Sequence, residues 1–298
     1  MHGKIVAGLA LAASLGIAQP VLAAPDWKAV AQALGKSGTE LPGGVYRVGL
    51  PRSDLKVTLD GVEIKPALAL GSWVAFEAMG DKDAMVMGDL VLTQPEVNPV
   101  MQKLVENGIE ITAVHNHLLS AEPATMYMHI EGRGDPVKLA AAVNAGLQES
   151  QTPLSDAPSG GNAPSTSIDL ETSKVDKALG HKGKVSGGVY QVSIPRAEKI
   201  TDADMPVPAA MGSAIAINFQ PTGNGKAAIT GDFVLASSEV NPVLRALRDN
   251  GIEVTALHSH MLNEEPRLFF MHFWANDDVE KLAHGLRAAL DKIHLASG

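Results

Sequence analysis

The sequence predicts an α+β fold, in which a mainly antiparallel sheet domain with packed helices occurs twice in tandem. Residues 88–136 match residues 231–279 at a constant offset of 143, and about half of the aligned positions are identical. Upstream, GGVYRVGLPR at 43–52 matches GGVYQVSIPR at 187–196. Helix-like and strand-like patterns also follow one another in the same order in both copies. Two copies are too few for a solenoid, so we expect two similar domains.

The expected domain boundaries follow from composition. Residues 1–23 contain Lys4, a short apolar run and small residues before the expected cleavage point, which is typical of a secretory signal peptide. Repeat 1 is then residues 24–150, and repeat 2 is residues 170–298. The stretch between them, 151–169, is rich in Pro, Ser, Gly and Asn and predicts a flexible linker. No other run is long and apolar enough to predict a membrane span.

Each repeat is expected to start with a short helix, at 27–35 and at 172–180. Strands are expected where apolar and β-branched residues dominate, at 44–50, 72–78 and 84–92 in repeat 1 and at 188–194, 214–220 and 227–235 in repeat 2.

The last part of each repeat reads β-α-β-β-α, which predicts a core like the split β-α-β motif. Its first helix is expected to have Asn98 or Asn241 as its N-cap and to end at Gly108 or Gly251. Two strands joined by a Glu-Pro loop and a closing helix complete the unit.

Composition excludes several classes of function. The chain has no cysteine, which excludes disulfides, thiolate metal sites and cysteine nucleophiles. Its net charge is −9, and loss of Lys4 with the signal peptide would make it −10. An acidic balance argues against a nucleic-acid partner. We expect an exported soluble protein, and the sequence leaves its oligomeric state open.

The residues that caps and turns leave unexplained are histidines and a glutamate, which recur with the same spacing in both repeats: His115, His117, Glu122 and His129, and His258, His260, Glu265 and His272. Alternate residues of a strand face the same side, so each HxH pair presents two imidazoles together. The next strand can place a third imidazole alongside, because cross-strand neighbours lie about 5 Å apart.

Three imidazoles and a carboxylate predict a site for a divalent transition metal, either one in each repeat or one that the two repeats share across a pseudo-two-fold axis. Zinc is the first candidate, and copper, nickel, manganese and iron also suit these ligands. Glu122 and Glu265 would be either a fourth ligand or a general base. Two other interpretations stay open: a polar cluster without a ligand, and a pocket that uses the histidines to bind an organic ligand.

Two further pairs of acidic residues are shared between the repeats. Asp89 corresponds to Asp232, and Glu96 corresponds to Glu239. For both pairs we favour a structural role as anchors of loop backbone over a place in the site.

The blocks NPV…NGIEITAVHNHLL…EP…MHI give the chain a resemblance to the LppY/LpqO family of exported bacterial proteins. The resemblance covers both repeats, and the block from Thr112 to His129 is its most specific part. The function of this family is uncharacterised, so the resemblance implies no activity and no catalytic residues for this chain. Some of its members are lipoproteins, but this chain has no cysteine for a lipid anchor. We therefore expect a soluble protein, periplasmic or secreted.

Two classes of function remain after these observations. One is a metal-binding protein or divalent-metal-dependent enzyme of the periplasm, with metal and a small molecule as its partners. The other is a non-enzymatic module that binds a cell-envelope or small-molecule ligand. The sequence has no nucleophile elbow, phosphate loop or HExxH motif, so it names no reaction.

Overall fold

The computed structural model describes residues 25–80, 82–154 and 167–296. The expected signal peptide, residues 1–23, therefore lies outside the described residues, as does most of the expected linker.

Repeat 1 forms one six-stranded sheet, in the order β1-β2-β5-β6-β8-β7, with antiparallel pairing throughout. Its strands are β1 (Thr39–Leu41), β2 (Val45–Pro51), β5 (Gly71–Met79), β6 (Asp83–Thr93), β7 (Glu110–His115) and β8 (Thr125–Gly134). A separate hairpin contains β3 (Val57–Leu59) and β4 (Val62–Ile64). The helices are α1 (Trp27–Leu34), α2 (Pro66–Ala69), α3 (Gln94–Glu106) and α4 (Pro136–Leu147).

Repeat 2 forms a matching six-stranded sheet, in the order β15-β17-β14-β13-β10-β9. Its strands are β9 (Lys184–Ser186), β10 (Val189–Ile194), β13 (Ile215–Gly223), β14 (Lys226–Ala236), β15 (Glu253–His258) and β17 (Leu268–Asp278). The short strands β11 (Thr201–Asp202), β12 (Met205–Pro206) and β16 (Glu264–Glu265) form a small extra sheet. The helices are α5 (Thr172–Leu179), the 3-10 turn η1 (Ala209–Met211), α6 (Val240–Asp249) and α7 (Val279–Leu290).

The predicted fold class is confirmed. In each sheet one long strand separates the two strands that a helix connects: β8 lies between β6 and β7, and β17 lies between β14 and β15. This is the split β-α-β arrangement expected from the last part of each repeat.

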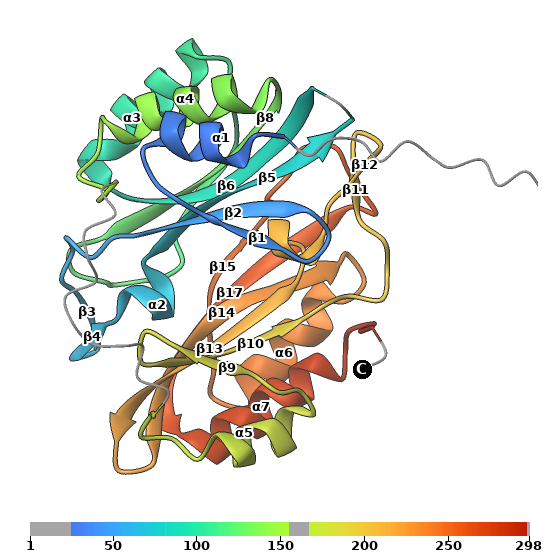
Figure 1. The fold of residues 1–298 in the computed structure, drawn as a ribbon. Coiled ribbons are helices and arrows are strands. Elements are labelled where there is room, and N and C mark those ends of the chain that lie inside the picture. The colour runs from blue at the N-terminus through green and yellow to red at the C-terminus, as the bar shows by residue number, and fades with distance from the viewer. Residues whose placement is uncertain (1–24, 81, 155–166, 297–298) are drawn as a thin grey trace, which may run out of the picture.

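The layers stack as helices, sheet, sheet and helices (Figure 1). The helices α1, α3 and α4 cover the outer face of the first sheet, and α5, α6 and α7 cover the outer face of the second. Successive strand residues point to opposite faces, so each strand contributes one set of side chains to the helices and the other set to the space between the sheets. That space contains the candidate site.

A segment of repeat 1 packs on repeat 2 and joins the two repeats. The segment with β3, β4 and α2 packs on repeat 2, where an apolar cluster includes Leu59, Leu68, Tyr127 and Trp274. Polar contacts supplement this packing: Gln220 Nε2 donates to the Glu63 carbonyl at 2.7 Å, and Asn218 Nδ2 donates to the Leu68 carbonyl at 3.2 Å. The two sheets are therefore held in a fixed relation by both apolar burial and hydrogen bonds.

The expected helix starts at Asn98 and Asn241 are wrong. Helix α3 begins at Gln94 and α6 begins at Val240, so both asparagines lie inside helices. For α3 the reason is a capping box: the Glu96 carboxylate accepts from the Thr93 backbone nitrogen at 2.8 Å. This bond satisfies a backbone donor that the first helical turn leaves unpaired, and it sets the start earlier.

Glu96 and Glu239 have the structural role that the sequence favours. Arg52 is fully buried, and its Nη1 lies 2.8 Å from Glu96 Oε2. Arg196 and Glu239 repeat the arrangement at 2.6 Å. Glu96 also accepts from the backbone nitrogen of Gln151 at 2.9 Å. This bond attaches the first residue of the expected linker to repeat 1.

Candidate metal centre

The six shared histidines lie on strands β7, β8, β15 and β17 or two residues beyond them. His115 is the last residue of β7, His129 lies in β8, and His117 follows β7 by two residues. Repeat 2 places its own three residues at the equivalent positions of β15 and β17, namely His258, His260 and His272. The strand period turns these side chains toward the space between the sheets.

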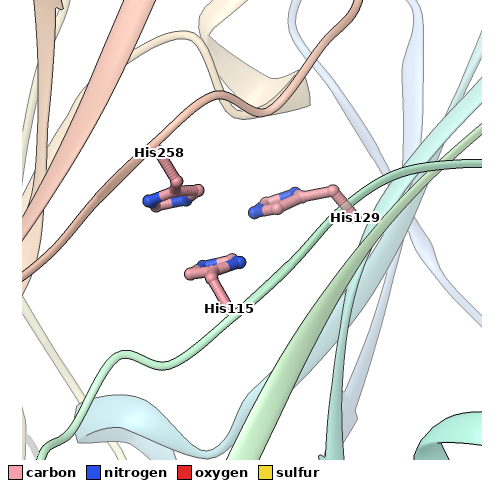
Figure 2. A group of neighbouring side chains, drawn as sticks. All are labelled: His115, His129 and His258. Carbon is pink, nitrogen blue, oxygen red and sulfur yellow. The ribbon is translucent and has the colours of Figure 1, made fainter.

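The histidines of the two repeats form one cluster instead of two. The rings of His115 and His258 stack with centroids 3.6 Å apart. The rings of His117 and His272 lie 3.7 Å apart, and those of His129 and His260 also lie 3.7 Å apart. Each of these close contacts joins residues of different repeats, and Figure 2 shows His115, His129 and His258 pointing toward one another.

Three groups of histidines have ligand nitrogens within 4.8 Å of one another. They are His115, His129 and His258; His115, His117 and His272; and His258, His260 and His272. Two of the three groups combine both repeats. Of the two arrangements that the sequence left open, the geometry favours a centre that the two repeats share.

Backbone carbonyls fix the orientation of the third histidine of each repeat. His272 Nδ1 lies 2.7 Å from the carbonyl oxygen of Gly231, and His129 hydrogen-bonds to the backbone of Gly88. A carbonyl only accepts, so Nδ1 of His272 carries the hydrogen and Nε2 has a free lone pair. Glycine is needed at 231, because an added Cβ would lie 1.9 Å from the Ala216 carbonyl oxygen.

Many of the ring nitrogens are buried and have no hydrogen-bond partner among the described residues: Nε2 of His117, His129, His260 and His272, and both nitrogens of His115 and of His258. An unpaired buried polar atom costs about 1–3 kcal/mol. A cluster of such atoms is costly in a protein that uses it only for packing, and it is the arrangement that a bound metal would satisfy.

Burial also keeps these imidazoles in the form that binds metal. Desolvation first, and neighbouring histidines second, hold the pKa of His115, His117, His129, His258 and His260 well below the ordinary histidine value. These rings are therefore neutral at neutral pH, as metal ligation requires.

Asp89 and Asp232 lie beside the histidines, and their place in the site was missed in the sequence. Strand pairing sets Asp89 directly opposite His129, and Asp232 opposite His272. Asp232 Oδ2 lies 3.2 Å from His260 Nε2. A signal was available: each aspartate belongs to the strand that flanks the third histidine, within a shared GD[LF]VL block.

Burial raises the pKa of both aspartates. For Asp89, desolvation acts most strongly, the charge of Asp232 adds to it, and Arg47 opposes both. For Asp232, desolvation raises the pKa to about 6, although His272 opposes it. A bound cation would lower both values by favouring the charged carboxylates.

The glutamates lie apart from the cluster. Glu122 and Glu265 are exposed, and neither belongs to a group of ligand atoms within 4.8 Å of one another. Glu122 instead pairs through its backbone with Thr58, at 2.9 Å from its nitrogen to the Thr58 carbonyl. Glu265 pairs in the same way with Thr201, and the exposed side chains of Glu122 and Glu265 face solvent.

The second histidine of each HxH pair is positioned by the opposite repeat. Thr112 Oγ1 donates to the carbonyl of His260 at 2.5 Å, and Thr255 Oγ1 donates to the carbonyl of His117 at 2.7 Å. These two bonds link the edges of the two sheets next to the cluster.

We expect Thr255→Val to destabilise the protein by about 1–3 kcal/mol, because it removes a donor and leaves a carbonyl unpaired. Urea unfolding measures the change. Thr222→Val is the matched control: its hydroxyl bonds to Asn276 near the surface, and a change within about 0.5 kcal/mol is expected. Equal losses in both variants would contradict a special role for the bond between repeats.

The fold and the cluster together define a duplicated α+β protein whose two repeats share one histidine centre. The chain belongs to the family described as Domain of Unknown Function (DUF1259), whose model matches residues 28–149 and again residues 173–292. A search of curated proteins finds no match.

Two solved structures align with most of the chain at low similarity. The trimeric bacterial microcompartment shell protein PduB is 13% identical with a TM-score of 0.20, covering 84% of this chain and 87% of that one. EtuB from Clostridium kluyveri is 11% identical with a TM-score of 0.19, covering 85% and 90%. Likeness at this level carries no argument about function.

Among the residues described, no helix combines the length and apolar character needed to cross a membrane.

Proposed function

We propose that this protein is an exported metal-binding protein that holds a divalent transition metal in the shared histidine cluster. The observation that carries the proposal is the set of unpartnered ring nitrogens, which six buried or half-buried imidazoles from two repeats bring together. Neutral imidazoles suit zinc first, and copper, nickel, manganese and iron as well.

The surroundings of the cluster support storage or transport of a metal more than turnover. A catalytic ion needs an open position for water or substrate. Here the rings are in contact with one another, and the rings of Tyr127 and Phe270 cover His117 and His260 at centroid distances of 3.5 and 3.4 Å. The same contacts leave little room for an organic ligand between the histidines.

Export to the periplasm or beyond is part of the proposal. It is supported by the charged, apolar and small-residue pattern of residues 1–23. The resemblance of the two repeats to the LppY/LpqO family of exported proteins supports it as well.

The test is the metal content of protein purified without a histidine tag. After exposure to zinc, copper, nickel, manganese or iron and removal of free ions, elemental analysis should find at least one equivalent of one metal per chain. We expect the double variant His115→Ala, His258→Ala to lose most of the bound metal. These two residues stack on each other, and each of the three ligand groups contains at least one of them.

His284→Ala is the control for this test, because His284 is exposed on α7, which covers the outer face of the second sheet, whereas the cluster lies between the two sheets. It should retain the full metal content. A parent protein that holds none of the five metals would contradict the proposed function.

A further inference from the structure

The number of imidazoles exceeds what one ion can use in this geometry. The cluster contains six histidines, yet each group of ligand atoms within 4.8 Å of one another contains three residues. Zinc sites bind four ligands in a tetrahedron, and catalytic sites use three from the protein. One ion on one such group would leave three buried imidazoles unsatisfied.

The pseudo-symmetry of the repeats allows the six histidines to be divided into two equivalent sets, one of which is a ligand group. The group of His115, His117 and His272 has ring spacings of 5.0, 3.7 and 5.3 Å. The remaining three residues are not one of the three ligand groups, but their ring centroids repeat this pattern: those of His258, His260 and His129 are 5.0, 3.7 and 5.8 Å apart.

This division, which we call crossed because each set contains histidines of both repeats, keeps two of the three close ring contacts between repeats and separates the third, between His115 and His258 at 3.6 Å. His117 lies 3.7 Å from His272 and His129 lies 3.7 Å from His260, and both pairs join different repeats. A division by repeat would separate each of these pairs. The crossed division keeps them together and uses every histidine once.

We propose that the cluster is a dinuclear centre that binds two divalent transition-metal ions. One ion binds His115, His117 and His272, and the other binds His258, His260 and His129. Each ion therefore bridges the two repeats. This inference rests on the proposed function, because it specifies the metal site on which that function depends.

Two buried carboxylates reduce the electrostatic repulsion between two adjacent cations. Asp89 and Asp232 are equivalent residues of the two repeats, and Asp232 lies 3.2 Å from His260 while Asp89 lies 3.7 Å from His117. Two carboxylates offset part of the repulsion between ions that two-metal sites hold about 3.5–4 Å apart.

The first test uses the unaltered protein. Loaded with copper(II), it should bind two ions per chain, and their unpaired electrons should couple because the ions are close. The integrated electron paramagnetic resonance signal should then fall well below two spins per chain. One copper per chain, or two with full uncoupled signals, would overturn the dinuclear centre.

The second test compares two double variants that each remove two histidines. His117→Ala with His272→Ala damages one crossed set, so one of the two ions should remain. His117→Ala with His129→Ala removes one ligand from each set, so both ions should be lost or much weakened. Circular dichroism and thermal unfolding check that both variants fold.

The outcomes separate the two proposals. No metal in the parent overturns the proposed function and the dinuclear centre together. One ion in the parent overturns only the dinuclear centre. Two ions with the reverse variant pattern, or with equal losses in both variants, overturn the crossed division. If a variant fails to fold, the spin coupling in the parent still decides whether the two ions are adjacent.

Discussion

The metal-free protein should lose stability steeply as the pH falls below about 6.5, the ordinary histidine pKa. Burial holds the pKa values of five histidines of the cluster well below this value in the folded protein: His115, His117, His129, His258 and His260. The unfolded chain therefore binds more protons than the folded protein below that pH, and acid favours unfolding. Each such group contributes up to about 1.4 kcal/mol per pH unit.

The two aspartates act in the opposite direction. Their pKa values are raised by burial, to about 6 for Asp232 and well above the usual value for Asp89, so the folded protein binds these protons first. Their contribution to stability grows as the pH falls through the raised values toward the ordinary one near 4. The five histidines outnumber the two aspartates, which leaves a net loss of up to about 4 kcal/mol per pH unit.

Urea unfolding of the metal-free protein between about pH 8 and pH 5 measures this slope. His258→Leu should reduce the slope by up to about 1.4 kcal/mol per pH unit, since it removes one such group. His284→Ala, on the exposed face of α7, should leave it unchanged. A free energy of unfolding that stays level over this range would show that the imidazoles are not buried in neutral form.

Arg52→Met should destabilise the protein by about 3–5 kcal/mol, which is the usual loss when one partner of a buried ion pair is removed. Arg52 is fully buried, donates to the Val91 carbonyl and contacts Glu96 at 2.8 Å. Its removal leaves the Glu96 carboxylate without its counter-charge beside the start of α3. Thermal or urea unfolding measures the loss.

Two comparisons sharpen this prediction. Adding Glu96→Gln to Arg52→Met should recover part of the stability, because it removes one of the two carboxylate charges that Arg52 compensates, the other being that of Asp54. Lys281→Met breaks the ion pair with Asp277, in which the lysine side chain is 60% exposed, and should cost at most about 1 kcal/mol. Similar losses for Arg52→Met and Lys281→Met would contradict the account of the buried pair.

The internal duplication made much of the fold predictable. Comparison of the copies marked the strands, the closing helices and the split β-α-β order, and these agree with the structure. The helix starts were misplaced because Asn98-Pro99 resembles a helix start, while the capping box that begins α3 lies five residues earlier, at Thr93 and Glu96. Local sequence signals of similar strength can compete within a few residues.

The composition of the candidate site was less predictable than the fold. Strand periodicity identified the histidines, but it describes one repeat at a time and could not show that His115 stacks on His258 of the other repeat. The partnership of Asp89 with His129 depends on the register between β6 and β8, which a single sequence does not specify. The position of Glu122 was also not predictable. The direction of its loop depends on contacts such as its backbone pairing with Thr58, which a single sequence does not reveal.

X-ray absorption spectroscopy of the zinc-loaded protein tests directly whether the histidine cluster binds the metal. We predict a first shell dominated by nitrogen at about 2.0–2.1 Å, with the outer-shell scattering of imidazole rings. The spectrum should change when His115 and His258 are both replaced by alanine and stay the same in His284→Ala. A shell of oxygen atoms without imidazole scattering, or a spectrum that the cluster variant leaves unchanged, would contradict metal binding by the histidine cluster.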